Sequence, residues 1–279
     1  MVLYPSSKYI DNLNKTKMLR LIFLFSFLLS TPLLAQERLI MIGGGKRTPD
    51  VMTKFIELSG KENGKILVIP WASGVQDESF DAFNKDVAAL STIKVEKASL
   101  SPLTPETKAI FLNQLKSATG VFFCGGDQTR IMAVLQDEEL FNALHAQYKN
   151  KVVFAGTSAG TAIMSQKMIT GEGDFKVIDG SKVEIKKGLG LLSNIIVDQH
   201  FIKRQRQNRL IGLIFQNPEL LGVGIDENTA VYVEDNRIAE VMGESQVMIF
   251  EAEKNRNEMK FLLLAKGEKF DLAKRKRVK

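Results

Sequence analysis

A serine between two glycines directly follows a predicted buried strand. Residues 151–155 read KVVFA, and they run into GTSAG at 156–160 and then into a helix-compatible segment. G-x-S-x-G in this context is typical of a nucleophile elbow, where small residues let a strand turn sharply into a helix. Such a turn exposes Ser158 Oγ and places the N–H of Ala159 where developing negative charge is stabilised. The plainer interpretation is a glycine-rich turn with a capping serine, because the pentapeptide alone is common.

A serine nucleophile needs a general base, and the chain has two histidines. His145 lies within 140–149, where apolar residues form a helical stripe, and we interpret it as a flank residue of that helix. His200 ends the apolar run IIVDQH, which predicts that it lies at the same sheet edge as Ser158. His200 is therefore the predicted base.

An acidic residue should orient the imidazole of this base. We favour Glu227 in GVGIDEN at 222–228, just after another predicted strand, and Asp226 and Asp198 remain alternatives. The chain order serine, histidine, glutamate argues against lipase-type α/β-hydrolases, which share the elbow but carry the acid before the histidine.

Two further glycine-rich segments follow predicted strands. The segment CGGDQ at 124–128 can supply a second oxyanion donor, and Gly126 is the predicted one because no side chain blocks its approach. Cys124 is an alternative nucleophile, but it precedes the turn, and we interpret it as a packing residue. The segment GGGKRT at 43–48 lacks the spacing of a P-loop or a dinucleotide-binding motif, so we expect it only to line the site.

Three arginines follow His200 in the segment FIKRQRQNRL. At about 100° per residue on a helix, Arg206 and Arg209 share a face, whereas Arg204 points elsewhere unless it precedes the helix. A solvated basic face or a nucleic-acid strip is the plainer interpretation. Their place beside the candidate base instead indicates carboxylate recognition through bidentate hydrogen bonds.

The elements that must position these residues alternate along the chain. Short apolar runs bounded by Gly or Pro are typical of strands buried on both faces, and they occupy 38–42, 65–69, 120–123 and 151–154. Helical patterns lie between or after them, at 49–60, 78–91, 105–117 and 128–148. This rhythm predicts an α/β fold with a mostly parallel sheet, helices on both faces and reactive residues at the carboxyl ends of the strands.

Beyond residue 220 the rhythm changes to closely spaced strands with Asp235-Asn236 as a hairpin turn. We predict that these strands form an antiparallel extension of one sheet edge; they are 221–225, 230–234, 237–242 and 246–250. No repeat or linker interrupts the chain, so we predict one catalytic domain over 36–273.

The composition of the 279 residues limits the classes of function. A single cysteine excludes an intramolecular disulfide framework, and with only two histidines we expect no metal site. The net charge of +6 resides at the ends: residues 1–35 carry +3 and residues 274–279 carry +5, which leaves −2 for the body. We expect the basic tail at 274–279 to be solvated and loose, and we expect no nucleic-acid partner.

Residues 1–35 have the form of a secretory signal peptide. Basic residues precede an apolar run at 21–29, and the 15 residues from Leu21 to Ala35 are shorter than the ~20 of a membrane span. We predict cleavage after Ala35, with Met18 as an alternative start and an uncleaved membrane anchor as the alternative interpretation. The expected mature protein is secreted or periplasmic, with no stable membrane insertion.

The motifs jointly resemble the cyanophycinase branch of the S51 serine peptidases, relatives of aspartyl dipeptidase. The matching segments are GGG at 43–45, GGDQ at 125–128, GTSAG at 156–160, DQHFxxRxRxxRL at 198–210 and GIDExTA at 224–230. The resemblance implies a three-layer α/β sandwich similar to class I glutamine amidotransferases, with a serine in place of their cysteine.

The resemblance also implies roles for individual residues. Ser158 matches the family's nucleophile, His200 its base and Glu227 its acid. Six positions match residues that shape the substrate pocket, namely Gln128, Asp198, Gln199, Arg204, Arg206 and Arg209. Thr161 departs from the alanine that the family often has.

The activity implied by the resemblance is hydrolysis of the β-aspartyl-arginine units of cyanophycin, a poly-aspartate with arginine on each side chain. No metal or organic cofactor is implied, and a homodimer is expected from the resemblance alone. Many family members are intracellular, whereas this chain has a leader. The alternatives are an aspartyl dipeptidase and a non-catalytic amidotransferase-like protein that binds a small acidic or peptide ligand; the complete triad weighs against the latter.

Overall fold

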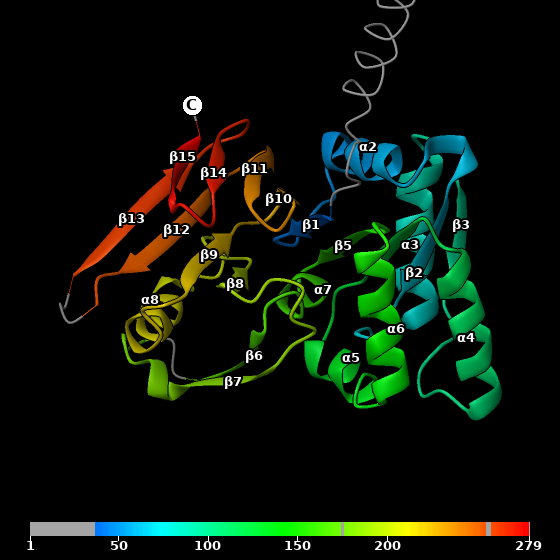
Figure 1. Ribbon diagram of the computed structural model, residues 1–279, viewed down its shortest axis with the longest axis horizontal. Coiled ribbons are helices and arrows are strands. Elements are labelled where there is room, and N and C mark those ends of the chain that lie inside the picture. Colours follow the sequence, from blue (N-terminus) through cyan, green and yellow to red (C-terminus); the bar gives the residue numbers. More distant parts are fainter. Residues whose placement is uncertain (1–36, 174–175, 255–257, 279) are drawn as a thin grey trace, which may run out of the picture. The chain divides into compact units, whose positions relative to one another are not determined.

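The computed structural model describes residues 37–173, 176–254 and 258–278, so the predicted leader at 1–35 lies outside the described residues. Residues from Glu37 onward form one compact unit (Figure 1). Within the described ranges, no helix combines the length and the apolar character that crossing a membrane requires.

A nine-stranded sheet dominates the fold. Five parallel strands make up one half of it, in the spatial order β1 (Arg38–Ile42), β5 (Val153–Thr157), β4 (Gly120–Phe123), β2 (Lys65–Ile69) and β3 (Lys94–Lys97). From β1 the sheet continues in antiparallel fashion through β10 (Thr229–Glu234), β11 (Ile238–Gly243), β14 (Lys269–Asp271) and β15 (Lys276–Val278). The predicted α/β class, with parallel central and antiparallel C-terminal strands, is confirmed.

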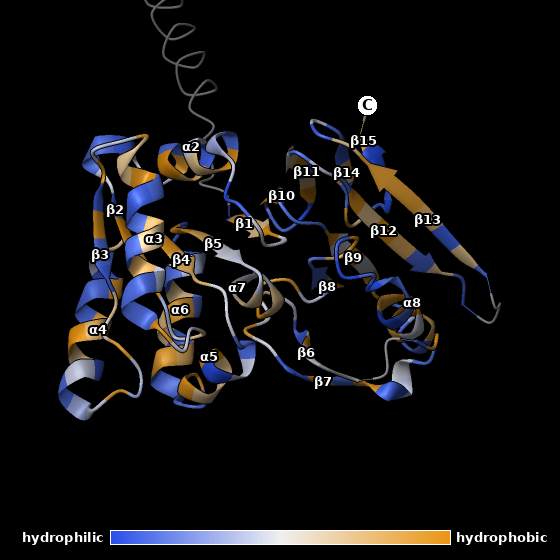
Figure 2. Ribbon diagram, turned by 180° about the vertical axis from the view of Figure 1, so that it is seen from behind, coloured by the Kyte–Doolittle hydropathy of each residue, from blue (hydrophilic) through white to orange (hydrophobic). Residues whose placement is uncertain are grey.

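The four inner parallel strands are buried on both faces, to which their successive side chains point in turn, whereas the edge strand β3 is partly exposed. On β1, Leu39 and Met41 pack into one core, and Ile40 and Ile42 pack into the other. Helices cover both faces: α2 (Pro49–Leu58) and α3 (Gln76–Ala88) on one side, and α4 (Pro105–Ser117), α5 (Gln128–Val134) and α6 (Glu138–Lys149) on the other (Figure 1). These helices carry both hydrophobic and hydrophilic residues, as expected for such outer layers (Figure 2).

A separate four-stranded sheet corrects the predicted edge extension. It contains β8 (Ile195–Gln199), β9 (Leu221–Ile225), β12 (Val247–Ala252) and β13 (Met259–Leu264). The segments 221–225 and 246–250 therefore do not extend the main sheet. β8 and β9 are parallel and are connected by α8 (Gln207–Gln216).

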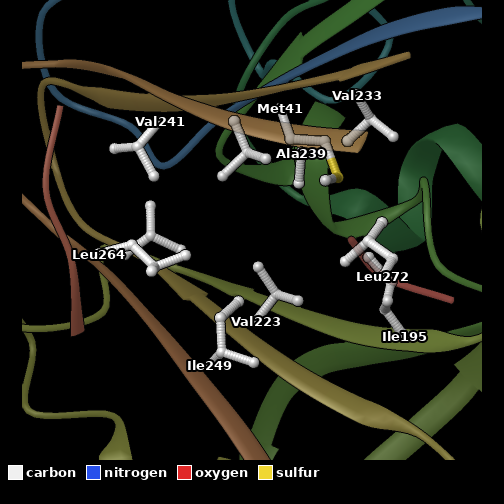
Figure 3. A pocket seen from close by; sticks show the side chains of 11 residues that line it. Met41, Ile195, Val223, Val233, Ala239, Val241, Ile249, Leu264 and Leu272 are labelled. Atoms are coloured by element: carbon white, nitrogen blue, oxygen red, sulfur yellow. The ribbon is translucent and has the colours of Figure 1, made fainter. Parts of the chain in front are cut away.

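The two sheets pack face to face through apolar side chains, which is why β9 and β12 are so apolar. Val223 and Ile249 of the smaller sheet lie opposite Val233 and Val241 of the larger one, around an apolar gap of about 10 Å³ (Figure 3). A strand buried in this way has the same sequence pattern whichever sheet it joins, so the pattern alone did not separate the two sheets.

Two local features bear on other sequence predictions. Segment 128–148 is two helices, not one, because Asp137 caps a new helix by accepting the N–H groups of Glu139 and Leu140. The predicted hairpin turn is confirmed: Asp235 and Asn236 have φ of 56° and 51° between β10 and β11, the left-handed values of a type I′ turn, and the N–H of Arg237 donates to the Glu234 carbonyl at 3.0 Å.

The basic C-terminus is ordered, which corrects the expectation of a loose tail. Residues 276–278 form β15 against β14. Arg275 pairs with Glu251 at 3.1 Å, and Arg277 pairs with Glu268 and donates to the carbonyl of Leu263. Glu251 and Glu268 therefore neutralise part of the positive charge of the C-terminus.

A two-stranded hairpin, absent from the sequence predictions, lies between α5 and α8 (Figure 1). It consists of β6 (Lys167–Gly173) and β7 (Val183–Lys187), and the short 3-10 helix Gly180–Lys182 between them packs against α8. The Nε2 of Gln128, at the start of α5, donates to the carbonyls of Ile169 and Thr170 at 2.7 and 2.6 Å. The hairpin is thus fixed to the main body beside the carboxyl ends of the parallel strands.

The remaining short helices of the described residues are the 3-10 helix Lys61–Asn63 and α7 (Ala159–Ala162).

Candidate functional site

Ser158 occupies the sharp turn between β5 and α7. Its φ of 53° and ψ of −111° are rare for a residue with a side chain, and such strain is common at functional positions. The glycines on either side are required by close packing. A Cβ at Gly156 would lie 2.3 Å from the Gly160 carbonyl oxygen, and one at Gly160 would lie 2.3 Å from that of Phe123. The local sequence therefore builds the predicted elbow.

Thr161, the departure from the family pattern, stabilises this turn. Its buried hydroxyl lies within hydrogen-bond distance of the carbonyls of Ile42 and Gly156, at 2.7 and 2.8 Å. The N–H of Ser158 also donates to the Ile42 carbonyl, at 3.0 Å. The end of β1 therefore holds both the elbow and the helix that follows it.

The three side chains selected from the sequence meet in one hydrogen-bonded line. Nε2 of His200 lies 2.8 Å from Ser158 Oγ, and its Nδ1 lies 2.7 Å from Oε1 of Glu227. With a proton on Nδ1, the imidazole donates to the carboxylate and accepts from the serine hydroxyl. That arrangement can activate a serine as a nucleophile.

His200 reaches Ser158 from the second sheet, so the expectation of a shared sheet edge is wrong. Among the described strands, β8 pairs with β9 alone, and α7 packs between β5 and β8. The N–H of His200 donates to the carbonyl of Gly43 at 2.7 Å. The loop after β1 therefore fixes the end of β8 beside the elbow.

The glycine loop at 43–45 positions the base and the acid, rather than merely lining the site. A Cβ on Gly44, whose φ is +110°, would lie 2.2 Å from Cε1 of the His200 imidazole. The Gly44 carbonyl also accepts the N–H of Asn228 at 2.9 Å, next to Glu227. Only glycine allows this close contact with the imidazole.

The other candidates for the acid and the base have different partners. Asp226 accepts the N–H groups of Ile202 and Lys203 at 3.1 and 2.9 Å. His145 stays on α6, where its Nε2 lies 2.8 Å from the carbonyl of Leu189. Neither residue belongs to the hydrogen-bonded line.

Two backbone amides beside Ser158 are free to bind an anion. Across the described ranges, the N–H groups of Ala159 and Gly126 donate to no acceptor. Gly126 lines the same cavity as Ser158 and has a φ of +139°, and a Cβ there would lie 2.1 Å from the Ala72 carbonyl oxygen. Both amides are thus available to an oxyanion formed at the serine.

Cys124 is a buried residue of the strand end, as its place before the turn predicted. Burial raises the pKa of its thiol to about 12, so the thiolate needed of a nucleophile does not form near neutral pH.

Ser158 opens into a cavity of about 380 Å³, a volume typical of small-ligand sites. Four of the six predicted pocket residues line it, namely Gln128, Gln199, Arg204 and Arg206. Nη1 of Arg206 donates to the backbone carbonyl and to Oε1 of Gln199 at 2.8 and 2.7 Å. Burial lowers the pKa of Arg206 to about 10, so its guanidinium stays charged at neutral pH.

Asp198 and Arg209, which the family resemblance implies shape the substrate pocket, do not line this cavity themselves. Each is only 1% exposed, and Arg209 binds the Asp198 carboxylate through both Nε and Nη2. Arg206 lies 3.6 Å from the same carboxylate. The pair therefore supports the cavity from within the core, and of the three arginines only Arg204 and Arg206 line it.

Sequence reasoning missed the lining residues of the hairpin. Thr170 and Gly171 of β6, and Glu184 and Lys186 of β7, face the cavity. The alternation of apolar and charged residues in VEIKK at 183–187 is the signal that could have identified β7 as a half-exposed strand.

Burial is the main reason that the pKa of His200 lies below its ordinary value of 6.5. The nearby charges of Arg204 and Arg206 lower it further, whereas the hydrogen bond to Glu227 and its charge raise it. The free imidazole is therefore neutral at pH 7.

Within the described ranges, no three His, Cys, Asp or Glu side chains are grouped to hold a metal ion.

We predict that kcat/KM falls at acid pH with a midpoint below 6.5, because protonated His200 cannot accept the serine proton. Arg204→Gln removes a charge that lowers the pKa of His200, so the acid limb should move to higher pH. Lys203→Gln, an exposed neighbour, is the control and should leave the limb in place. Profiles of kcat/KM against pH test this; an unmoved limb in Arg204→Gln would contradict it.

The site is of the Ser–His–acid type, set on an α/β fold. The family model described as Peptidase family S51 matches residues 39–241, and the chain belongs to this family. Among curated proteins it is similar to the cyanophycinase of Synechococcus elongatus, with 34% identity over 212 residues, 75% of this chain and 66% of that protein. The cyanophycinase of Trichormus variabilis is 31% identical over 223 residues, 78% of this chain and 75% of that one. The chain thus spans slightly less than two thirds of the Synechococcus protein.

Solved structures share the fold. A peptidase from an acI-B1 Actinobacterium superposes with a TM-score of 0.65 at 21% identity, covering 85% of this chain and 98% of that one. A putative peptidase E protein from Listeria monocytogenes gives a TM-score of 0.54 at 18% identity, covering 76% and 100%.

Proposed function

We propose that the protein is a serine-type peptidase with Ser158 as nucleophile, His200 as general base and Glu227 as the acid that orients it. The observation that carries this proposal is the continuous line of 2.8 and 2.7 Å contacts between the three side chains. Family membership supports it.

In the proposed mechanism, Ser158 Oγ attacks the scissile carbonyl while His200 Nε2 takes the hydroxyl proton. The amides of Ala159 and Gly126 donate to the oxyanion of the tetrahedral intermediate. The imidazolium, held by Glu227, then protonates the leaving amine, and the acyl-enzyme forms. Water attacks the ester with His200 again as base, which releases the product and restores the serine.

The proposed substrates are β-aspartyl-arginine units of cyanophycin or related aspartyl peptides, removed one unit at a time. Two observations support this choice: the chain's similarity to proteins named cyanophycinase, and the guanidinium groups of Arg204 and Arg206 beside the serine. Arginine suits carboxylate recognition because its planar guanidinium can donate two parallel hydrogen bonds to the two carboxylate oxygens.

The proposed site of action is outside the cytoplasm. The leader-like pattern of residues 1–35 supports export to the periplasm or the medium. A homodimer is proposed from the family resemblance alone.

The test is incubation of the purified protein with cyanophycin and with α- and β-aspartyl dipeptides, followed by mass analysis of the products. We expect release of β-Asp-Arg by the native protein and none by Ser158→Ala. Cleavage of α-aspartyl dipeptides alone would favour the aspartyl dipeptidase alternative. No product from any substrate would favour the non-catalytic, ligand-binding alternative.

A further inference from the structure

The cavity at Ser158 carries charges of both signs. Arg204 and Arg206 precede α8, whereas Glu184 and Lys186 lie on β7 and Asp127 begins α5. An ionised carboxylate that faces such a cavity can bind a cation carried by the ligand.

Glu184 is held in one orientation by a neighbouring strand. Oγ1 of Thr170, on β6, donates to its Oε2 at 2.7 Å, and Nζ of Lys186 lies 3.1 Å from its Oε1. These two contacts, the hydrogen bond first, lower the pKa of the Glu184 carboxyl, so it is ionised at neutral pH. Its side chain remains 44% exposed, and so a ligand can reach it.

The strand beneath Glu184 is itself fixed. Gln128 donates to the carbonyls of Ile169 and Thr170, which ties β6 to the start of α5. Thr170 is nearly buried, at 9% exposed. Hence the Glu184 carboxylate is presented to the cavity from a positioned strand rather than from a free loop.

We propose that Glu184 binds the cationic side chain of the substrate, a guanidinium in the preferred case, while Arg204 and Arg206 bind its carboxylate. This assignment rests on the proposed peptidase function and adds to it the selection of a substrate with both charges. The partner that the substrate cation displaces is Lys186, whose 55% exposed ammonium forms a weak surface pair. A guanidinium can replace it with two parallel hydrogen bonds.

Asp127 is the less suitable carboxylate of the two. Its Oδ1 accepts both the N–H and the hydroxyl of Thr129, at 2.8 and 2.6 Å, and so caps α5. The Asp127 carboxylate therefore serves as a helix cap. Because it lines the same cavity as Glu184, Asp127 is the matched control.

The experiment compares two synthetic oligomers of β-aspartyl units, one carrying arginine and the other citrulline. Citrulline has nearly the same shape without the charge. We expect the native protein to show a KM about 10–100-fold lower for the arginine oligomer, the range of a charge-assisted hydrogen bond. Glu184→Gln keeps the acceptor for Thr170 and should reduce this preference to about 1–3-fold, through a higher KM for the arginine oligomer.

Asp127→Asn should keep the arginine preference of the native protein. Equal KM values for both oligomers in the native protein would overturn the role of Glu184 while leaving the peptidase function standing. The same conclusion follows if Glu184→Gln keeps the preference, or if Asp127→Asn alone removes it. Failure of the native protein to cleave either oligomer would instead overturn the proposed function.

Discussion

Ser158→Ala and His200→Ala are each expected to lower kcat on an aspartyl peptide by about 10⁴–10⁶-fold, and the double variant should lose no more than the worse single one. The serine is nucleophilic only when its proton passes to the imidazole 2.8 Å away, so removing either group removes the same step. Single-turnover rates of the three variants, with circular dichroism to verify folding, measure this effect. Additive losses would show that the two residues do not act as one unit.

Replacing Glu227, the acid that orients His200, should lower kcat less than the largest losses expected for Ser158 and His200. The loss should still be large enough to identify Glu227 as the acid. Glu227→Gln keeps the shape but no longer stabilises the imidazolium, and about a 10⁴-fold loss in kcat is typical of such a change. Asp226→Asn is the matched control one residue away, because the Asp226 carboxylate receives backbone amides rather than the imidazole. A large kcat loss in Asp226→Asn with little in Glu227→Gln would reverse the assignment of the acid.

The elbow could be derived from sequence because its causes are local. Gly156 and Gly160 are glycines since a Cβ at either would collide with the backbone, and the buried strand before them marks the turn. His200 could be selected by elimination between two histidines. The way in which the fold brings His200 to Ser158 could not be predicted from the sequence. β8 belongs to a second sheet, and its end is held by the carbonyl of Gly43, which is far away in the sequence.

The substrate pocket was the least predictable part for a related reason. Helical spacing placed Arg206 and Arg209 on one face, but spacing does not tell which face is buried. In the structure Arg206 immediately precedes α8 as its N-cap residue and lines the cavity, whereas Arg209 is buried in the core. Glu184 lies on a hairpin whose position depends on Gln128, a tertiary contact with no signature in either segment.

Asp198→Ala is expected to lower the free energy of unfolding by about 3–5 kcal/mol, because it leaves the Arg209 guanidinium buried without its counter-charge. Asp77→Ala removes one partner of an exposed ion pair and serves as the control, with an expected loss of about 0–1 kcal/mol. Urea unfolding monitored by circular dichroism measures both.

The double variant Asp198→Leu/Arg209→Met separates a structural role from a substrate role. Replacing both charges with apolar groups of similar size removes the unpaired guanidinium, so most of the lost stability should return. If Asp198→Ala keeps native stability yet raises KM, Asp198 contacts the substrate, as the family resemblance implies. If stability falls and the double variant restores it, the pair holds the chain between β8 and α8. In that case Asp198 and Arg209 affect the substrate only by positioning Arg206, which lies 3.6 Å from Asp198 and lines the cavity.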